Sequence, residues 1–314
     1  MGAGGSGMSA EFIIAAIITV VGLTTPILLA GIGELVVEKS GVLNLGVEGM
    51  MLVGAISGFA VTVMTFNPWL GVIGAAAGGA AASLLFAVLV LQLNSNQVAT
   101  GLALTIFGTG LSSLLGLSFT GRIVAPFTSV FPDVLAKDPI GRLVFGYSPI
   151  VYFALVMVPL TAWFLKSTRA GLILRAVGEN DLSAHSIGYS VRRVRYGAIA
   201  FGGAMAGIGG CYFSMVITPM WAEKMTAGRG WIALALVVFA GWRMGRLLAG
   251  AYFFGILMAL ELYAKASGFS FLPSQFWAAM PYLMTIVALS FISSRGTAGS
   301  NAPACLGKPF LPST

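Results

Sequence analysis

Hydrophobic and polar positions follow one another along this chain in long blocks rather than in a mixed pattern. Long apolar runs are separated by shorter stretches that hold most of the charged residues. The runs fall at about 11–33, 49–66, 69–93, 97–119, 149–165, 196–219, 230–242, 247–265 and 276–292. A hydrocarbon core of about 30 Å needs about 20 apolar residues in helical form. The pattern therefore predicts an all-α polytopic membrane protein with about nine or ten transmembrane helices.

A membrane β-barrel is excluded by the same pattern. Backbone groups in lipid must be satisfied within a helix or a closed barrel, and a barrel needs alternating segments of about ten residues. The run LLFAVLVLQL at 84–93 shows no alternation. Small-residue pairs four positions apart further predict tightly packed helices. These pairs are Gly54/Gly58, Gly74/Gly78 and Gly203/Gly207.

Composition and charge agree with a membrane protein. Hydrophobic residues make up 58% of the chain and charged residues 9%, against roughly 25% charged residues in ordinary soluble domains. This excludes a water-soluble globule and a disordered chain. The net charge of +7 is interpreted as a signal for orientation and not for nucleic-acid binding. The most basic stretch is 166–195, which the positive-inside rule places in the cytoplasm.

The domain organisation expected from the sequence is simple. Residues 1–7, MGAGGSG, are expected to be an artificial addition before Met8. Residues 8–295 form a single transmembrane domain with a cytoplasmic loop at 166–195, and residues 296–314 form a cytoplasmic tail. The side of the N-terminus depends on residues 34–48. If they form an inside loop, the N-terminus lies outside; if they cross as a broken helix, it lies inside and there are ten spans.

Residues 34–48 combine charge with flexibility next to long apolar runs. A charge at the bilayer centre costs about 2.5–3.5 kcal/mol even on insertion scales. Glycines at 41, 46 and 49 favour a broken or re-entrant helix, which is tolerated only where protein or water surrounds it. Two interpretations stay open: an interfacial elbow, or a segment that borders a translocation path. The polar residues concerned are Glu34, Glu38, Asn44 and Glu48.

Three further stretches combine polar or charged residues with apolar runs, and two of them have two interpretations each. Residues 176–189 fit a short amphipathic helix, capped by Asn180 or Asp181, that docks a soluble partner; they also fit a plain basic loop. Gly228-Arg229-Gly230 fits a turn with an interfacial anchor. Asn96 and Gln97 begin an apolar run, where amides suit either a helix cap or a neutral hydrogen-bonding solute.

Several kinds of chemistry have no motif here. There is no G-x-x-x-x-G-K-[ST] phosphate-binding loop, and the single histidine, His185, excludes an H-E-x-x-H zinc site. The two cysteines, Cys211 and Cys305, form neither a disulfide framework nor a zinc pattern. We therefore expect no catalytic residue, no metal and no cofactor in this chain.

The stretches EKSGVLNLGVEGMMLVGA (38–55), NQVATGLALTIFGTGLS (96–112), RAVGEN (175–180), GRGWIALALVVFAGW (228–242) and PYLMTIVAL (281–289) carry a resemblance. Together they resemble permease subunits of bacterial ABC importers of the branched-chain/ribose permease superfamily, nucleoside (simple sugar) branch. The resemblance covers about residues 20–295. Two departures are Asp181, where the family pattern has a proline, and Arg243-Met244-Gly245-Arg246, which lacks a family-like proline.

The resemblance implies a division of labour. ATP, with Mg, is bound and hydrolysed by a separate subunit with two fused nucleotide-binding domains. A substrate-binding protein of the basic membrane lipoprotein type delivers the solute. The chain's length resembles the smaller of two paired permeases, which implies a longer paralogous partner in the bacterial plasma membrane, surrounded by lipid. The loop 176–189 corresponds to the helix that couples the permease to the ATPase. The matching positions are Glu179, Asn180, Ala184 and Gly188, and His185 on the same segment is a further candidate for contact with the ATPase.

The leading hypothesis is ATP-driven uptake of nucleosides by alternating access. The candidate residues for the path or gate are Asn44, Glu48, Asn96 and Gln97. Ribose-like sugars are the alternative substrates. An ion-coupled secondary transporter is a second class, for which Glu48 and Glu261 are the plausible ionisable groups. A membrane scaffold or membrane enzyme is a third class.

Overall fold

The computed structural model describes residues 4–127, 130–132, 135, 138–266, 273–294 and 302–311. Apart from an isolated bridge between Ile123 and Met220, the regular structure of these residues is helical. The helices are α1 (Gly4–Lys39), α2 (Val47–Thr65), α3 (Pro68–Leu91), α4 (Gln97–Gly116), η1 (Leu117–Phe119), α5 (Pro139–Phe145), α6 (Pro149–Ser167), α7 (Arg169–Glu179), α8 (Asp181–Ser186), α9 (Val191–Tyr212), η3 (Phe213–Ile217), α10 (Arg229–Phe239), α11 (Met244–Ala266) and α12 (Ser274–Ser294).

The predicted all-α membrane architecture is confirmed for the described residues. Seven of their helices, namely α1, α2, α3, α4, α6, α9 and α11, are long and apolar enough to cross a membrane, and α10 is a shorter apolar helix. Three of the residues expected to be an artificial addition, 1–3, lie outside the described residues, and so do residues 296–301 and 312–314 of the expected tail. Nothing in the structure tests those boundaries.

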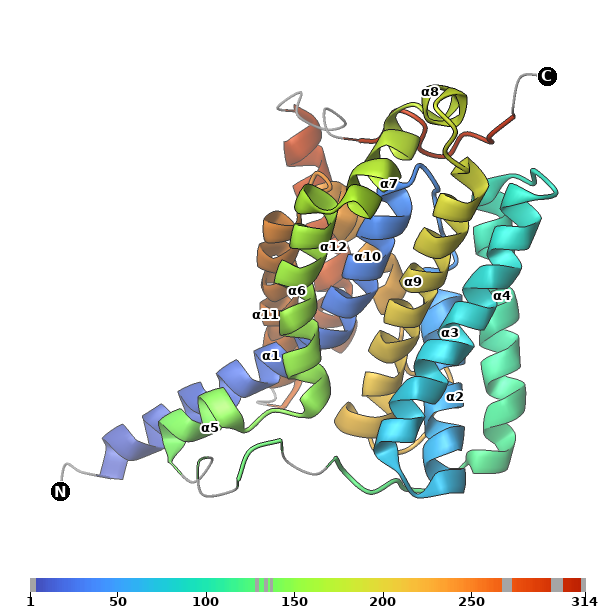
Figure 1. The fold of residues 1–314 in the computed structure, drawn as a ribbon. Helices are drawn as coiled ribbons and strands as arrows, with labels where there is room; N and C mark the ends of the chain where they lie inside the picture. Colours follow the sequence, from blue (N-terminus) through green and yellow to red (C-terminus); the bar gives the residue numbers. More distant parts are fainter. Residues whose placement is uncertain are drawn as a thin grey trace.

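The two ends of the bundle differ. Figure 1 shows α7, α8 and the C-terminal segment at one end, which we call the α8 end, and the N-terminus with α5 at the other. The helix α1 is unbroken through Lys39, where it reaches the α8 end. Residues 34–39 are therefore helical, and the predicted break is confined to the loop 40–46. Since this loop does not cross the bundle, the N-terminus lies on the side opposite α8.

The helix α9 lies at the centre of the fold and packs against α1, α2 and α3. Small residues make this possible, as the glycine pairs predicted. A Cβ atom added to Gly54 of α2 would lie 2.2 Å from Cα of Gly207, and one added to Gly207 would lie 2.2 Å from the carbonyl oxygen of Ala75. Between apolar helices in lipid, such close backbone contact supplies the packing energy. Glycine is therefore required at these crossings.

A second interrupted element, the segment 218–228 followed by the short helix α10, enters the bundle from the end opposite α8. The helix α10 has 11 residues, so at about 1.5 Å per residue it is about half as long as the hydrocarbon core is thick. The segment 218–228 precedes it and begins beside residue 123, yet Thr226 is fully buried. The second half of this segment therefore turns into the bundle, where Thr226 and Gly228 contact Glu48 at the start of α2.

The glycine packing of α9 gives a matched pair of tests on one helix. We expect Gly207→Ala to destabilise the protein by about 3 kcal/mol, because the backbone that its Cβ would meet has no room to yield. The control is Gly197→Ala, since a Cβ there meets nothing within 4 Å and alanine favours the helix. Thermal unfolding in detergent, followed by size-exclusion chromatography, measures both. Equal melting temperatures for the two variants would contradict the packing argument.

Candidate functional site

Two short helices form the tip of the α8 end. The helix α7 is amphipathic: it buries Leu174 and Val177, and Thr168 caps its start by accepting a hydrogen bond from the Gly171 amide at 3.1 Å. Asn180 ends α7 and begins α8, where its Oδ1 accepts a hydrogen bond from the Ser183 amide at 2.9 Å. The predicted cap is thus Asn180. The predicted single helix over 176–189 is instead divided at this residue, because its extended backbone interrupts the helix.

The predicted coupling residues occupy different positions on this tip. Glu179, Asn180, His185 and Gly188 are exposed, whereas Ala184 is buried beneath α8. Gly188 has a φ of +94°, which favours glycine and ends the turn after α8. Two apolar side chains of the same segment face outward, Leu182 with 49% and Ile187 with 71% of its surface exposed. A helix with this mixed outer face suits docking of a protein partner.

A buried ion pair joins α8 to the bundle. Nη2 of Arg195 lies 3.1 Å from Oδ2 of Asp181, and Nε of the same guanidinium donates to the carbonyl oxygen of Ser40 at 3.2 Å. Arg195 is fully buried. Removing one partner of a buried pair leaves an uncompensated charge, which costs about 3–5 kcal/mol. The pair therefore holds α8, the start of α9 and the loop 40–46 together.

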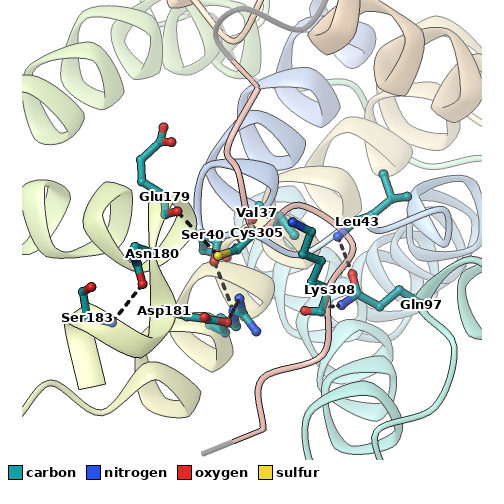
Figure 2. A network of polar contacts seen from close by, with 11 residues as sticks. Val37, Ser40, Leu43, Gln97, Glu179, Asn180, Asp181, Ser183, Cys305 and Lys308 are labelled. Carbon is teal, nitrogen blue, oxygen red and sulfur yellow. Dashed lines mark hydrogen bonds and ion pairs between the residues drawn. The ribbon is translucent and has the colours of Figure 1, made fainter. Parts of the chain in front are cut away.

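The C-terminal residues 302–311, which we call the strap, lie across this same region (Figure 2). The amide of Cys305 donates to the carbonyl oxygen of Gly178 at 2.9 Å, and the amide of Gly307 donates to that of Gly41 at 3.2 Å. Phe310 packs into an apolar cluster under α8. The strap therefore contacts both α7 and the loop 40–46.

The amides that begin α4 also belong to this end. Asn96 caps α4 by accepting a hydrogen bond from the Ala99 amide at 3.0 Å, which confirms the helix-cap interpretation. Gln97 is buried; its Oε1 accepts from the Leu43 amide at 2.7 Å and its Nε2 donates to the Lys308 carbonyl oxygen at 3.4 Å. Figure 2 shows Gln97 between Leu43 and Lys308. Both amides thus contact backbone groups at the α8 end.

The other polar candidates point into the bundle. Asn44 donates from Nδ2 to Glu34 at 3.1 Å and accepts from the Gly46 amide at 3.0 Å, which shapes the loop before α2. Glu38, one helical turn after Glu34, accepts a hydrogen bond from the indole of Trp242 at 2.5 Å. All of these side chains are buried or nearly so. The acidic face of α1 is therefore in contact with the loop 40–46 and, through Trp242, with the turn that follows α10.

Glu48 connects the two broken elements. Its Oε1 accepts hydrogen bonds from Thr226 Oγ1 at 2.6 Å and from the Gly228 amide at 2.8 Å, and its Oε2 accepts from the Gly230 amide at 2.6 Å. These amides form the N-terminus of α10, where the helix dipole favours a carboxylate. The first turn of α2 is also buried. A carboxylate inside the bundle is thus stabilised by three donors and a helix end.

The Gly-Arg-Gly stretch has a specific geometry at this contact. Gly228 adopts a φ of +79°, and a Cβ on Gly230 would lie 2.6 Å from Cα of Glu48. Both positions therefore need glycine. The intervening Arg229 places its guanidinium 4.8 Å from the centre of the Phe213 ring, a cation–π distance. The expected turn is confirmed, and its partner is the carboxylate of Glu48.

Comparison with known proteins decides the family. Residues 16–289 match the family described as branched-chain amino acid transport system, permease component. The chain belongs to this permease family. As a member of it, the permease is a transport component and not an enzyme, and its apolar helices make it a multi-pass membrane protein.

Named relatives cover almost the whole permease. The putative glucose ABC transporter permease of Haloferax volcanii is 42% identical over 289 residues, which are 85% of this chain and 88% of the relative. The guanosine ABC transporter permease of Bacillus subtilis is 30% identical over 303 residues, 91% and 93% of the two chains. The nucleoside ABC transporter permease of Lactococcus lactis is 29% identical over 288 residues, 88% and 91%.

Sequence reasoning missed several residues of this site. In the sequence, Arg195 is one of six cations of the basic stretch 166–195. Asp181 is one of only two acids in that stretch, which is a signal for pairing with one of these cations. Thr226 and Trp242 gave no signal, because their partners Glu48 and Glu38 are far away in sequence. The strap also gave no signal, since its links to Gly178, Gly41 and Gln97 use its own backbone atoms.

Glu48 gives the sharpest test of the interior. We expect Glu48→Gln to destabilise the permease by about 3 kcal/mol, because one of three buried donors then faces an amide NH₂ group rather than an oxygen. Uptake should fall with it, since α10 loses its fixed N-terminus. The control is Glu223→Gln, an exposed acid that only accepts from Ser113 at 3.2 Å. Thermal unfolding and uptake are measured on both; a Glu48→Gln protein as stable as the control would contradict the assignment.

Proposed function

We propose that this permease is the transmembrane subunit of an ATP-driven importer that takes up nucleosides by alternating access in a bacterial plasma membrane. The observation that carries the proposal is the connection between an exposed docking helix and the polar interior. Leu182 on α8 and Ile187 directly after it are 49% and 71% exposed, while Asp181 pairs with the buried Arg195. Family membership and the names of the relatives support transport by an ABC system and the substrate class.

The proposed transmission follows contacts in the structure. Movement of α8 would be passed by the Asp181–Arg195 pair to the backbone of Ser40. The loop 40–46 continues directly into α2, whose first turn carries Glu48. Glu48 in turn fixes the N-terminus of α10. A displacement at the tip would therefore reach the half-length helix in the bundle interior without any covalent chemistry in this chain.

The substrate class rests on two kinds of support. Two relatives are named for guanosine and for nucleosides, and both match along about nine-tenths of the chain. Nucleosides are neutral, so a path for them needs hydrogen-bonding groups and no counter-charge. A sugar is the second candidate, because the 42% identical relative is named as a putative glucose permease. We retain Asn44 as the candidate for contact with either solute, since Asn96 and Gln97 face the α8 end.

The partners belong to the same proposal. We infer a separate ATPase with two fused nucleotide-binding domains, which would bind ATP and Mg at sites of its own. A longer paralogous permease would complete the path, and a basic-membrane-lipoprotein-type protein would deliver the solute. The exposed residues Glu179, Asn180, His185 and Gly188 are the proposed contacts with the ATPase. Ala184 would act indirectly, because it supports α8 from below.

The geometry favours this proposal over ion-coupled secondary transport. An ion-coupling carboxylate must exchange its partner during the cycle. Glu48 is held by three donors of one helix end. Glu261 pairs with Lys265 at 2.7 Å on a partly exposed face of α11. Both acids therefore have local structural partners.

Uptake by the reconstituted system tests the function and the substrate together. We expect vesicles that hold this permease, its paired permease and its ATPase to take up labelled guanosine when the binding protein and ATP are both present. Labelled glucose should compete weakly. Uptake driven by a proton or sodium gradient through this chain alone would overturn the importer proposal. Preferred uptake of glucose over guanosine would instead establish the sugar candidate.

The exposed face of α8 gives a separate test of coupling. We expect Glu179→Lys combined with Leu182→Asp to lower uptake about tenfold, which corresponds to about 1.4 kcal/mol of lost docking energy. ATP hydrolysis by the ATPase should continue at its uncoupled rate. Lys166→Glu is the control, since it changes charge at the same end outside α8. Normal uptake by the double variant would exclude α8 as the docking helix.

A further inference from the structure

The strap is connected to the α8 end through its backbone and through side chains. Its backbone bonds reach Gly178 of α7 and Gly41 of the loop 40–46, and its Lys308 carbonyl accepts from Gln97 of α4. Phe310, which is only 7% exposed, packs beneath α8. Leu306 packs against the main core, and Sγ of Cys305 donates to the carbonyl oxygen of Glu179 at 3.6 Å. A segment distant in sequence from all four partners thus bridges α4, α7, α8 and the loop 40–46.

One backbone hydrogen bond of the strap satisfies a carbonyl group at the end of a helix. The last carbonyl groups of a helix have no partner within it. The Cys305 amide bonds to Gly178, in the last turn of α7. The strap also packs over Gly41, where an added Cβ would lie 3.0 Å from Nη2 of Arg195 and 3.4 Å from Cβ of Cys305. The strap therefore covers the place where the buried guanidinium meets the loop.

Phe310 anchors the strap beneath α8. It belongs to one apolar cluster with Val177, Ala184 and Val191, which come from α7, α8 and the start of α9. The ring of His185 lies 5.4 Å from the Phe310 ring at an angle of 69°. The only large apolar side chain that follows, Leu311, is 63% exposed. The contact beneath α8 thus depends on the Phe310 side chain, whereas the bonds to Gly178, Gly41 and Gln97 use backbone atoms of the strap.

We propose that the strap is a positioning segment that makes α8, the loop 40–46 and the start of α4 move as one unit when the ATPase acts on α8. This rests on the proposed function. The Asp181–Arg195 pair already connects α8 to Ser40. The strap adds a second, independent connection to the same loop and extends it through Gln97 to α4. Loss of the strap leaves α8 able to bind the ATPase and weakens the transfer of its movement.

The first experiment compares Phe310→Ala with Leu311→Ala in the assembled importer. Since a buried aromatic side chain is lost only in the first variant, we expect uptake per ATP hydrolysed to fall about tenfold in Phe310→Ala. Leu311→Ala and Lys308→Ala should match the unaltered protein, because one side chain is exposed and the other contributes only its backbone. Phe310→Leu should restore most of the coupling. Co-purification of the ATPase should be unchanged throughout.

The result that overturns the proposal is an unchanged ratio of uptake to hydrolysis in Phe310→Ala. A loss of melting temperature or of ATPase co-purification with an unchanged ratio would equally reject it, because the strap would then only stabilise the fold. If the unaltered importer itself shows no ATP-driven uptake, the proposed function fails. The positioning role is then still tested by a second experiment, a distance measurement on the permease alone that needs no transport.

That experiment measures the distance between α8 and α4 in the permease alone. Spin labels are placed at Ser186→Cys and Val98→Cys, both exposed positions, with Cys305→Ser to remove the accessible thiol. We expect one narrow distance distribution, and a broad one after Phe310→Ala is added. Adding Leu311→Ala should leave the distribution narrow. A narrow distribution in the Phe310→Ala protein would show that α8 is held without the strap.

Discussion

The contact between the Glu48 carboxylate and the N-terminus of α10 determines how the interior of this permease is built. A buried carboxylate is costly unless several donors surround it. Here the donors are Thr226 and the amides of Gly228 and Gly230. They are available only because α10 begins inside the bundle and not at its rim. The acid and the half-length helix therefore require each other, and both require glycines that let the two backbones approach.

This contact lies at one end of a continuous series of polar contacts. At the other end, Asp181 of α8 pairs with Arg195, which also bonds to Ser40. Between them the loop 40–46 is held by Gln97 at Leu43 and by Glu34 at Asn44. Spatial continuity alone does not establish coupling. It does show which groups must break or shift together if α8 moves, and the side chains of Arg195, Glu34, Asn44 and Gln97 among them are buried.

The sequence predicted the parts of the structure that depend on local pattern. The long apolar runs predicted the helices, the glycine pairs predicted the close packing of α9, and Asn180 and Asn96 were among the candidate caps. Each of these signals lies within a few residues of the feature it specifies. The break near 34–48 was also expected, although α1 continues through Glu38 before it ends.

The partners across the fold could not be predicted in the same way. Glu48 and Gly230 are 182 positions apart, and Glu38 and Trp242 are 204 apart. A charged residue next to an apolar run shows that a partner must exist, because an unpaired charge there is too costly. It does not show which residue that partner is. The strap is harder still, since backbone bonds such as those of Cys305 and Gly307 make few demands on side-chain identity.

The fold has two parts that differ in how they are held together: closely packed helices, and short interrupted segments joined by polar contacts. The central helices α1, α2, α3 and α9 meet backbone to backbone at positions such as Gly54 and Gly207, where a displacement of even a methyl radius has no room. Packed interiors of this kind respond as rigid units. The loop 40–46, the segment 218–228, α8 and the strap are held instead mainly by hydrogen bonds and by the Asp181–Arg195 ion pair, which are exchangeable. A cycle that alternates between two states would thus concentrate its changes in these elements, with Glu48 marking where the exchangeable part meets the rigid one.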